Sequence, residues 1–152
     1  MRYERPDRLT KSVFNPIMML LTRVGIGPRG ARTLAVRGRK SGEWRTVPVN
    51  PLTLDGRRYL VAPRGETEWV RNIRAAGGGE LRLGSRREAI RVAELSDDGK
   101  PPVLRGYLKN WKMETGKFFG GMTAESSEEE LRGIAPRHPV FRILEDAIHT
   151  SL

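Results

Sequence analysis

The sequence predicts an α+β fold in which a small β-barrel or sandwich of mainly antiparallel strands is flanked by separate helices. Short apolar runs between turn signals fill residues 32–95, two helical patterns follow at 97–135, and a last strand pattern lies within 139–145. A chain of 152 residues is long enough to bury one hydrophobic core. We therefore expect a single domain over residues 1–152, with an N-terminal helical segment at 1–28.

An amphipathic helix is expected at 12–24, where apolar residues recur at helical spacing and Pro16 suits a first turn. Packing on the core is the favoured interpretation, and peripheral membrane contact is the alternative. The apolar run is too short to cross a bilayer and lacks a cleavage site, which predicts a cytoplasmic protein, with peripheral membrane association under the alternative. The next stretch, GIGPRG (25–30), has the glycine spacing of a dinucleotide-binding turn, but a helix precedes it, so we interpret it as a helix stop.

The first strands flank a basic turn. RTLAVRG (32–38) and EWRTVPVNP (43–51) lie on either side of this turn, and an Asp55-Gly56 turn precedes a third strand at 57–62. These three strands predict a meander. GELRLGSRREAIRVAEL adds two strands joined at Gly84-Ser85, and PVFRIL (139–144) gives a sixth.

Three helices are expected after the first strands. Thr67 or Glu66 can begin a short helix, which the glycines at 77–79 end while freeing the backbone. Asp97 or Asp98 is expected to cap a helix with prolines in its first turn and an apolar stripe that includes Tyr107 and Trp111. The last helix has a capping-box pattern, with Ser126 or Ser127 followed by Glu129 or Glu130, and it is expected to end at Gly133.

The composition limits the chemistry. The chain has no cysteine and two histidines, which excludes disulfides, thiolate metal sites and cysteine nucleophiles and predicts no metal centre. The net charge of +10 favours an anionic partner, which can be a nucleic acid, an acidic membrane surface, or a phosphorylated or polycarboxylate ligand.

Three ordered segments carry a family resemblance: GRKSGEWRTVPV, DGRRYLVAPRG and EWVRNIRA. Together they resemble the deazaflavin-dependent nitroreductase family, whose members use coenzyme F420 in a split β-barrel. The resemblance covers residues 12–95 well, and PVLRGYLKNW and RHPVF resemble one branch of that family. It implies a split β-barrel of about six mainly antiparallel strands with flanking helices.

The same resemblance implies a binding site for a flat, polyanionic cofactor. The basic turn and the strand after it correspond to the segment with which the family binds the phosphate and the acidic tail of the cofactor. The corresponding residues are Arg39, Lys40, Ser41 and Arg45. Thr46 and Pro48 correspond to positions along the ribitol and ring. The loop Ala62-Pro63-Arg64 and the motif residues Trp69 and Asn72 complete the set, although Pro63 stands where the family usually has serine. Read without the family, Trp69 is the core face of a helix and Asn72 a local cap.

The activity implied by the resemblance is transfer of a hydride from reduced F420 to an electron-poor small molecule, such as a quinone, a nitroaromatic or an activated enone. Catalytic residues are not identified; Tyr107 and His138 are weak candidates for a proton donor, and packing roles are favoured for both. A monomer and a homodimer both stay open.

Two alternatives remain. An FMN- or haem-binding split barrel has the same fold as the F420-dependent family and binds its anionic group in a similar way. A basic nucleic-acid-binding barrel explains the charge, but such a barrel should expose aromatic rings along its strands for stacking on bases. The predicted strands contain chiefly Trp44 and Tyr59 as aromatic residues, so no nucleic acid is expected as a partner.

Overall fold

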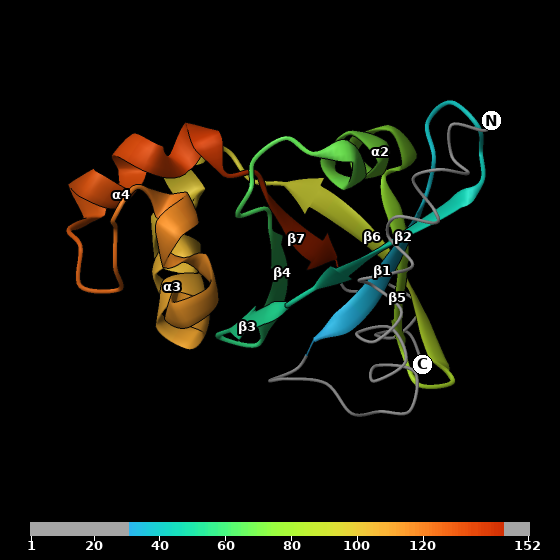
Figure 1. Cartoon of the computed structure of the whole chain (residues 1–152), viewed down its shortest axis with the longest axis horizontal. Helices are drawn as coiled ribbons and strands as arrows, with labels where there is room; N and C mark the ends of the chain where they lie inside the picture. The colour runs from blue at the N-terminus through green and yellow to red at the C-terminus, as the bar shows by residue number, and fades with distance from the viewer. Residues whose placement is uncertain (1–30, 145–152) are drawn as a thin grey trace.

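Seven antiparallel strands form one curled sheet within the part of the chain that the structure describes (Figure 1). In the computed structural model, residues 31–144 are described, except for the side chains of 111–117. The helix expected at 12–24, the GIGPRG turn and the side chain of Trp111 therefore lie outside these residues. The strands are β1 (Arg32–Arg37), β2 (Trp44–Val49), β3 (Leu52–Leu54), β4 (Arg57–Val61), β5 (Gly78–Leu83), β6 (Arg86–Glu94) and β7 (Val140–Leu144), and they pair in the order β2-β1-β5-β6-β7-β4-β3.

The curl of this sheet makes a half-barrel, and three helices flank it, so the predicted α+β split barrel is confirmed. Helix α2 (Glu68–Ala76) lies beside β1, whereas α3 (Pro101–Thr115) and α4 (Glu128–Ile134) stand together on the side of β3 and β4 (Figure 1). Short 3₁₀ turns lie at Asp97–Gly99, Gly116–Phe119 and Ala135–Arg137.

The predicted three-stranded meander is wrong. β2 pairs only with β1 at one edge of the described sheet, and β3 and β4 lie at the other edge. The chain leaves the first hairpin at Asn50 and Pro51, and β3 then pairs with β4 across the Asp55-Gly56 turn, which adds the strand that the sequence did not predict. Pro48 faces Thr33 on this edge strand, where a missing backbone donor is tolerated.

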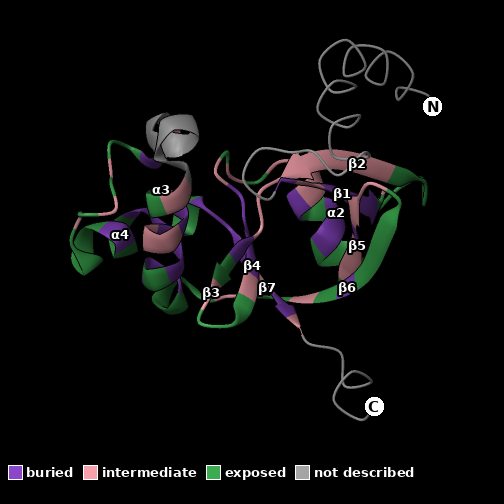
Figure 2. Ribbon diagram, turned by 90° about the horizontal axis from the view of Figure 1, so that it is seen from below, coloured by how far each residue is buried: buried purple, intermediate pink, exposed green. Residues whose placement is uncertain are grey.

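Two apolar clusters lie on opposite faces of β4 and β7. Figure 2 shows the buried residues in these strands and in α2, α3 and α4. Tyr59 and Val61 face the helices α3 and α4, whereas Leu60 faces the interior of the half-barrel. The interior cluster also takes Val70 and Ile73 from α2, so this helix fills part of the barrel. Burial on both faces explains why β4 reads as a continuous apolar run rather than an alternating one.

Only the first glycine of 77–79 acts as predicted. Gly77 ends α2 in a left-handed conformation with a φ of 78°. Gly78 and Gly79 are residues of β5, where an added Cβ would lie 2.1 Å from the Ile90 carbonyl oxygen and 2.5 Å from the Ala35 carbonyl oxygen. These two glycines therefore allow neighbouring strands to approach closely, and they do not free the backbone.

The last helix begins as predicted and ends slightly later. Ser127 and Glu130 form the capping box, in which the Glu130 N–H donates to Ser127 Oγ at 3.0 Å and the Ser127 N–H donates to Glu130 Oε1 at 2.8 Å. The helix continues past Gly133 to Ile134. Within residues 31–144, no helix has the length and hydrophobicity needed to cross a membrane.

Candidate functional site

The turn between β1 and β2 is a tight loop of six residues, 38–43. The Gly38 N–H donates to the Glu43 carbonyl at 2.8 Å, and the Gly42 N–H donates to the Gly38 carbonyl at 2.8 Å. The Glu43 N–H donates to Ser41 Oγ at 3.1 Å. These hydrogen bonds within the loop stabilise its conformation.

Gly38 allows two side chains of the site to approach the backbone. A Cβ at this position would lie 2.9 Å from Ser41 Oγ and 3.3 Å from Arg45 Nε. Both distances are shorter than ordinary carbon contacts, so any larger residue would push Ser41 and Arg45 outward. The absence of a side chain at Gly38 therefore sets the shape of the basic turn.

Asn72 on α2 holds this turn in place from the opposite side. Its Oδ1 accepts hydrogen bonds from the Arg39 backbone N–H at 3.0 Å and from Arg39 Nη1 at 2.8 Å, and the residue is only 5% exposed. Glu68, one helical turn earlier, pairs with Arg39 Nη1 at 2.8 Å. The hydrogen bond from Arg39, and the positive charges of Arg39, Arg71 and Lys40, hold the pKa of Glu68 below its usual range.

Glu68 was not predicted as part of the site, although a signal was present. Glu68 and Asn72 are four residues apart, which places them on one face of a helix. An acid and an amide on that face are suited to hold a guanidinium. The sequence thus contained the pattern, but the partner, Arg39, lies 29 positions from Glu68 and 33 from Asn72 along the chain.

Several donors of the basic turn stay available. Within residues 31–144, the Lys40 ammonium forms no ion pair, and the backbone N–H groups of Lys40 and Ser41 donate no hydrogen bond. Successive unpaired N–H groups beside a cation make a concave site for an anion. The hydroxyl of Thr67, the residue before α2, is also buried without a hydrogen-bond partner among the described residues.

The predicted residues of β2 lie on two faces. Val47 and Val49 pack against the interior cluster, so Arg45, of the same parity, belongs to the interior face. Thr46 and Pro48 belong to the outer face. The structure therefore does not place Arg45 on the same face as Thr46 and Pro48.

The loop after β4 is held against the C-terminal part of the chain. The Ala62 N–H donates to the Pro139 carbonyl at 2.9 Å, and Ala62 is 1% exposed. Pro63 is half-buried, and Arg64 is exposed with its guanidinium 5.4 Å from the centre of the Phe118 ring. The structure thus places Arg64 beside Phe118, and among residues 31–144 Arg64 forms no hydrogen bond or ion pair with Arg39 or Lys40.

Trp69 contributes mainly to packing. Its ring lies 5.9 Å from the ring of Phe141, and it joins the interior cluster beside Ile73. Asn72, the other motif residue, contacts the turn as described above. The two motif side chains therefore have a structural role in the folded chain, which is compatible with a ligand contact made by the backbone of the helix.

Both candidate proton donors are buried. Tyr107 is 3% exposed and belongs to the apolar cluster between β4 and the helices α3 and α4, with its ring 6.2 Å from that of Phe119. His138 is 3% exposed, is stacked on Phe119 at 4.2 Å, and has Nδ1 3.4 Å from the Ala62 carbonyl oxygen. Burial lowers the pKa of His138, against the opposing effect of the Ala62 and Pro63 carbonyls.

The donor set fits an anionic cofactor. The turn offers an ammonium, two backbone N–H groups and a hydroxyl, which suit a phosphodiester or carboxylates. No group of side chains suited to a metal ion occurs in the described part of the chain.

Comparison with known proteins gives one matching family and several solved structures of similar fold. The sequence profile of the F420H(2)-dependent quinone reductase family matches residues 20–115. No curated protein sequence matches the chain. The matched range includes the basic turn, the loop at 62–65 and α2.

Three solved structures illustrate the fold. An F420-H2-dependent reductase (FDR-A) is 17% identical over 76% of this chain and 95% of its own, with a TM-score of 0.55. A protein described as a domain-swapped dimer is 17% identical over 91% of this chain and 99% of its own, with a TM-score of 0.57. A heme-binding protein from Mycobacterium smegmatis is 12% identical over 83% of this chain and 48% of its own, with a TM-score of 0.50. At these identities the likeness shows the fold alone.

Proposed function

The chain belongs to the F420H(2)-dependent quinone reductase family, and we propose that it reduces a quinone with electrons from reduced coenzyme F420. The family membership confirms the resemblance seen in the sequence. The observation that supports this proposal best is the anion-binding turn, whose free donors lie within the matched range. Nitroaromatics and activated enones are further candidate acceptors of the same electron-poor class.

When bound, reduced F420 supplies a hydride to the acceptor. We assign Lys40, Ser41 and Arg39 to the phosphodiester and acidic tail, with the Lys40 ammonium as a point charge and the turn N–H groups as directional donors. Arg45 adds a second cation beside Gly38. These residues bind and orient, and the protein needs no nucleophile of its own.

The remaining residues extend the proposed site toward the ring. Thr46 and Pro48 share the outer face of β2, and the loop Ala62-Pro63-Arg64 and the start of α2 supply backbone groups. Asn72 is a positioning residue, because it acts through Arg39. Tyr107 and His138 are not proposed as proton donors, since each is only 3% exposed.

The turnover assay uses the purified full-length chain under anaerobic conditions with reduced F420 and menadione, a nitroaromatic or a cyclic enone. We expect acceptor-dependent oxidation of F420 with menadione. Lys40→Ala should raise the KM for reduced F420, whereas Lys109→Ala, which removes an exposed lysine of α3, should leave it unchanged. Absence of oxidation with every acceptor would contradict the proposal.

A binding screen separates the alternatives. F420, FMN and haem are titrated separately, and fluorescence quenching or spectral shifts are followed. Tight binding of FMN or haem with no binding of F420 would favour the alternative split-barrel function. Haem is included in the screen because a heme-binding protein has a similar fold.

A further inference from the structure

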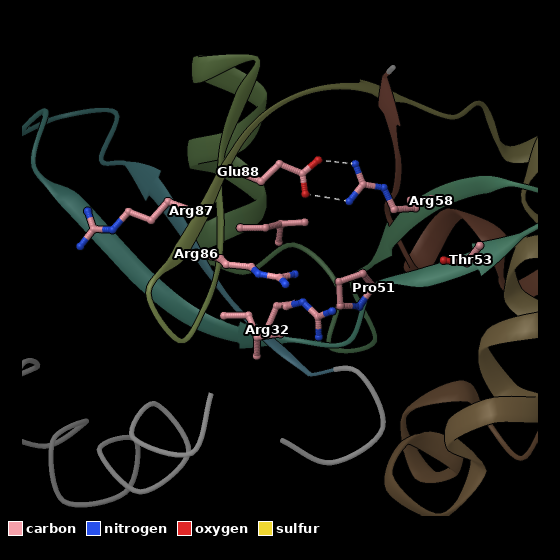
Figure 3. A pocket seen from close by; sticks show the side chains of 9 residues that line it. Arg32, Pro51, Thr53, Arg58, Arg86, Arg87 and Glu88 are labelled. Carbon is pink, nitrogen blue, oxygen red and sulfur yellow. Dashed lines mark hydrogen bonds and ion pairs between the residues drawn. The ribbon is translucent and has the colours of Figure 1, made fainter. Parts of the chain in front are cut away.

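A second cationic site lies at the other end of the half-barrel. A pocket of about 580 Å³ is lined by Arg32, Pro51, Thr53, Arg58, Leu81, Leu83, Arg86, Arg87 and Glu88 (Figure 3). Arg32 begins β1, whereas the basic turn follows its last residue, Arg37. The length of β1 separates the two sites by roughly 17 Å at about 3.3 Å per residue.

The register places two arginines on either side of a leucine. Arg32 is one residue beyond the Thr33–Arg82 pair, so it neighbours Leu83, and Leu83 pairs with Arg86. Figure 3 shows the Arg32 and Arg86 side chains extending toward the same part of the pocket, near Pro51. Two guanidinium groups from different strands are thus directed at one apolar surface, an arrangement suited to contact an anion.

The pocket lies beside the hairpin of β5 and β6, and a pair of side chains from two strands closes one side of it. Arg58 on β4 donates to Glu88 on β6, with Nη1–Oε1 at 2.9 Å and Nη2–Oε2 at 2.5 Å (Figure 3). This bidentate pair forms one wall of the pocket.

The lining has an excess of positive charge over an apolar floor. Four arginines and one glutamate leave three positive charges in excess. Within residues 31–144, the side chains of Arg86 and Arg87 form no ion pair or hydrogen bond. Leu81, Leu83 and Pro51 supply the apolar surface, and the volume falls in the range of small-molecule sites.

We infer that this pocket binds a small organic phosphate monoester, with the phosphate between Arg32 and Arg86 and an apolar ring on Leu81 and Leu83. A phosphate monoester has about −1.5 to −2 charges at neutral pH, which suits the excess better than a single carboxylate does. Guanidinium groups bind phosphate oxygens in a bidentate manner. This site shares no residue with the proposed cofactor site.

The test titrates the full-length protein with phenyl phosphate in a calorimeter at low salt. Arg86→Ala should weaken binding by about tenfold or more, as expected for the loss of one charge-assisted contact. Arg91→Ala removes the same charge from the same strand outside the pocket, and it should change the dissociation constant by less than about twofold. Equal losses in both variants, or no binding to the wild type, would overturn the inference.

Two further binding measurements locate the phosphate group and the ring of the bound phenyl phosphate. Loss of phenyl phosphate binding in Lys40→Ala but not in Arg86→Ala would place the ligand at the basic turn and overturn the inference. Inorganic phosphate should bind at least about tenfold more weakly than phenyl phosphate, and Leu83→Ser should reduce that difference. Equal affinity for the two ligands in the wild type would contradict a role for the apolar floor.

The contribution of the excess positive charge to phosphate binding is tested by a separate substitution. Glu88→Gln removes the negative charge of the lining and should tighten phenyl phosphate binding, whereas weaker or unchanged binding would contradict the charge argument. Independently of any substitution, amide NMR signals of Gly84 and Ser85 in the adjoining hairpin should shift on titration. Shifts confined to Lys40 and Ser41 would overturn the assignment.

Discussion

Asn72→Ala should destabilise the protein by about 2 kcal/mol, because it removes the acceptor that fixes the basic turn. The Arg39 N–H then loses a partly buried partner at 3.0 Å, which costs about 1–3 kcal/mol. The lost bond from Arg39 Nη1 adds less, since that guanidinium keeps its contact with Glu68 and is partly exposed. The better helix propensity of alanine returns about 0.5 kcal/mol.

Urea unfolding followed by circular dichroism measures this effect. Asn72→Asp keeps an acceptor oxygen and should retain most of the stability, and Arg71→Ala, an exposed residue of the same helix, should change it by less than about 0.5 kcal/mol. A free energy of unfolding for Asn72→Ala within about 0.5 kcal/mol of the wild type would refute the argument that Asn72 fixes the turn.

Three further perturbations test the site. Lys40→Ala should weaken F420 binding by about 1–3 kcal/mol, and more at low salt, in a fluorescence titration; an unchanged dissociation constant would remove Lys40 from the site. Gly38→Ala should cost about 1–2 kcal/mol in urea unfolding and weaken F420 binding, because the new Cβ would lie 2.9 Å from Ser41 Oγ; wild-type values for both would contradict this. Because burial lowers the pKa of His138, the unfolded chain takes up the proton first as the pH falls below about 6.5, so stability should decrease toward lower pH. His138→Phe should flatten that decrease between about pH 5 and 7 in urea unfolding, and an identical pH profile would show that His138 is not its source.

Local patterns predicted most elements of the fold but not the order of the strands. The hairpin of β1 and β2, the Gly84-Ser85 turn and the capping box of Ser127 and Glu130 are local, and all three are confirmed. The meander was wrong because the pairing of β4 with β7 joins residues about eighty positions apart. The local sequence of β4 does not indicate which distant strand pairs with it.

In the candidate site, too, local patterns were predictable from the sequence and long-range contacts were not. The basic turn was visible as a run of cations between two strands, and its open donors agree with an anion-binding role. The role of Asn72 could not be chosen from the sequence, because an amide on a helix serves equally as a ligand contact or as a cap. The second cationic site was missed because its residues Arg32, Arg58 and Arg86 come from three separate strands.

The central claim is that the basic turn binds the anionic part of F420. The most direct test compares the dissociation constants of F420 for the wild type, Lys40→Ala and Lys109→Ala at low and high salt. The account predicts tight binding to the wild type, a loss of about tenfold or more in Lys40→Ala that shrinks at high salt, and wild-type binding in Lys109→Ala. Equal affinity in all three proteins, or no F420 binding by the wild type, would contradict it.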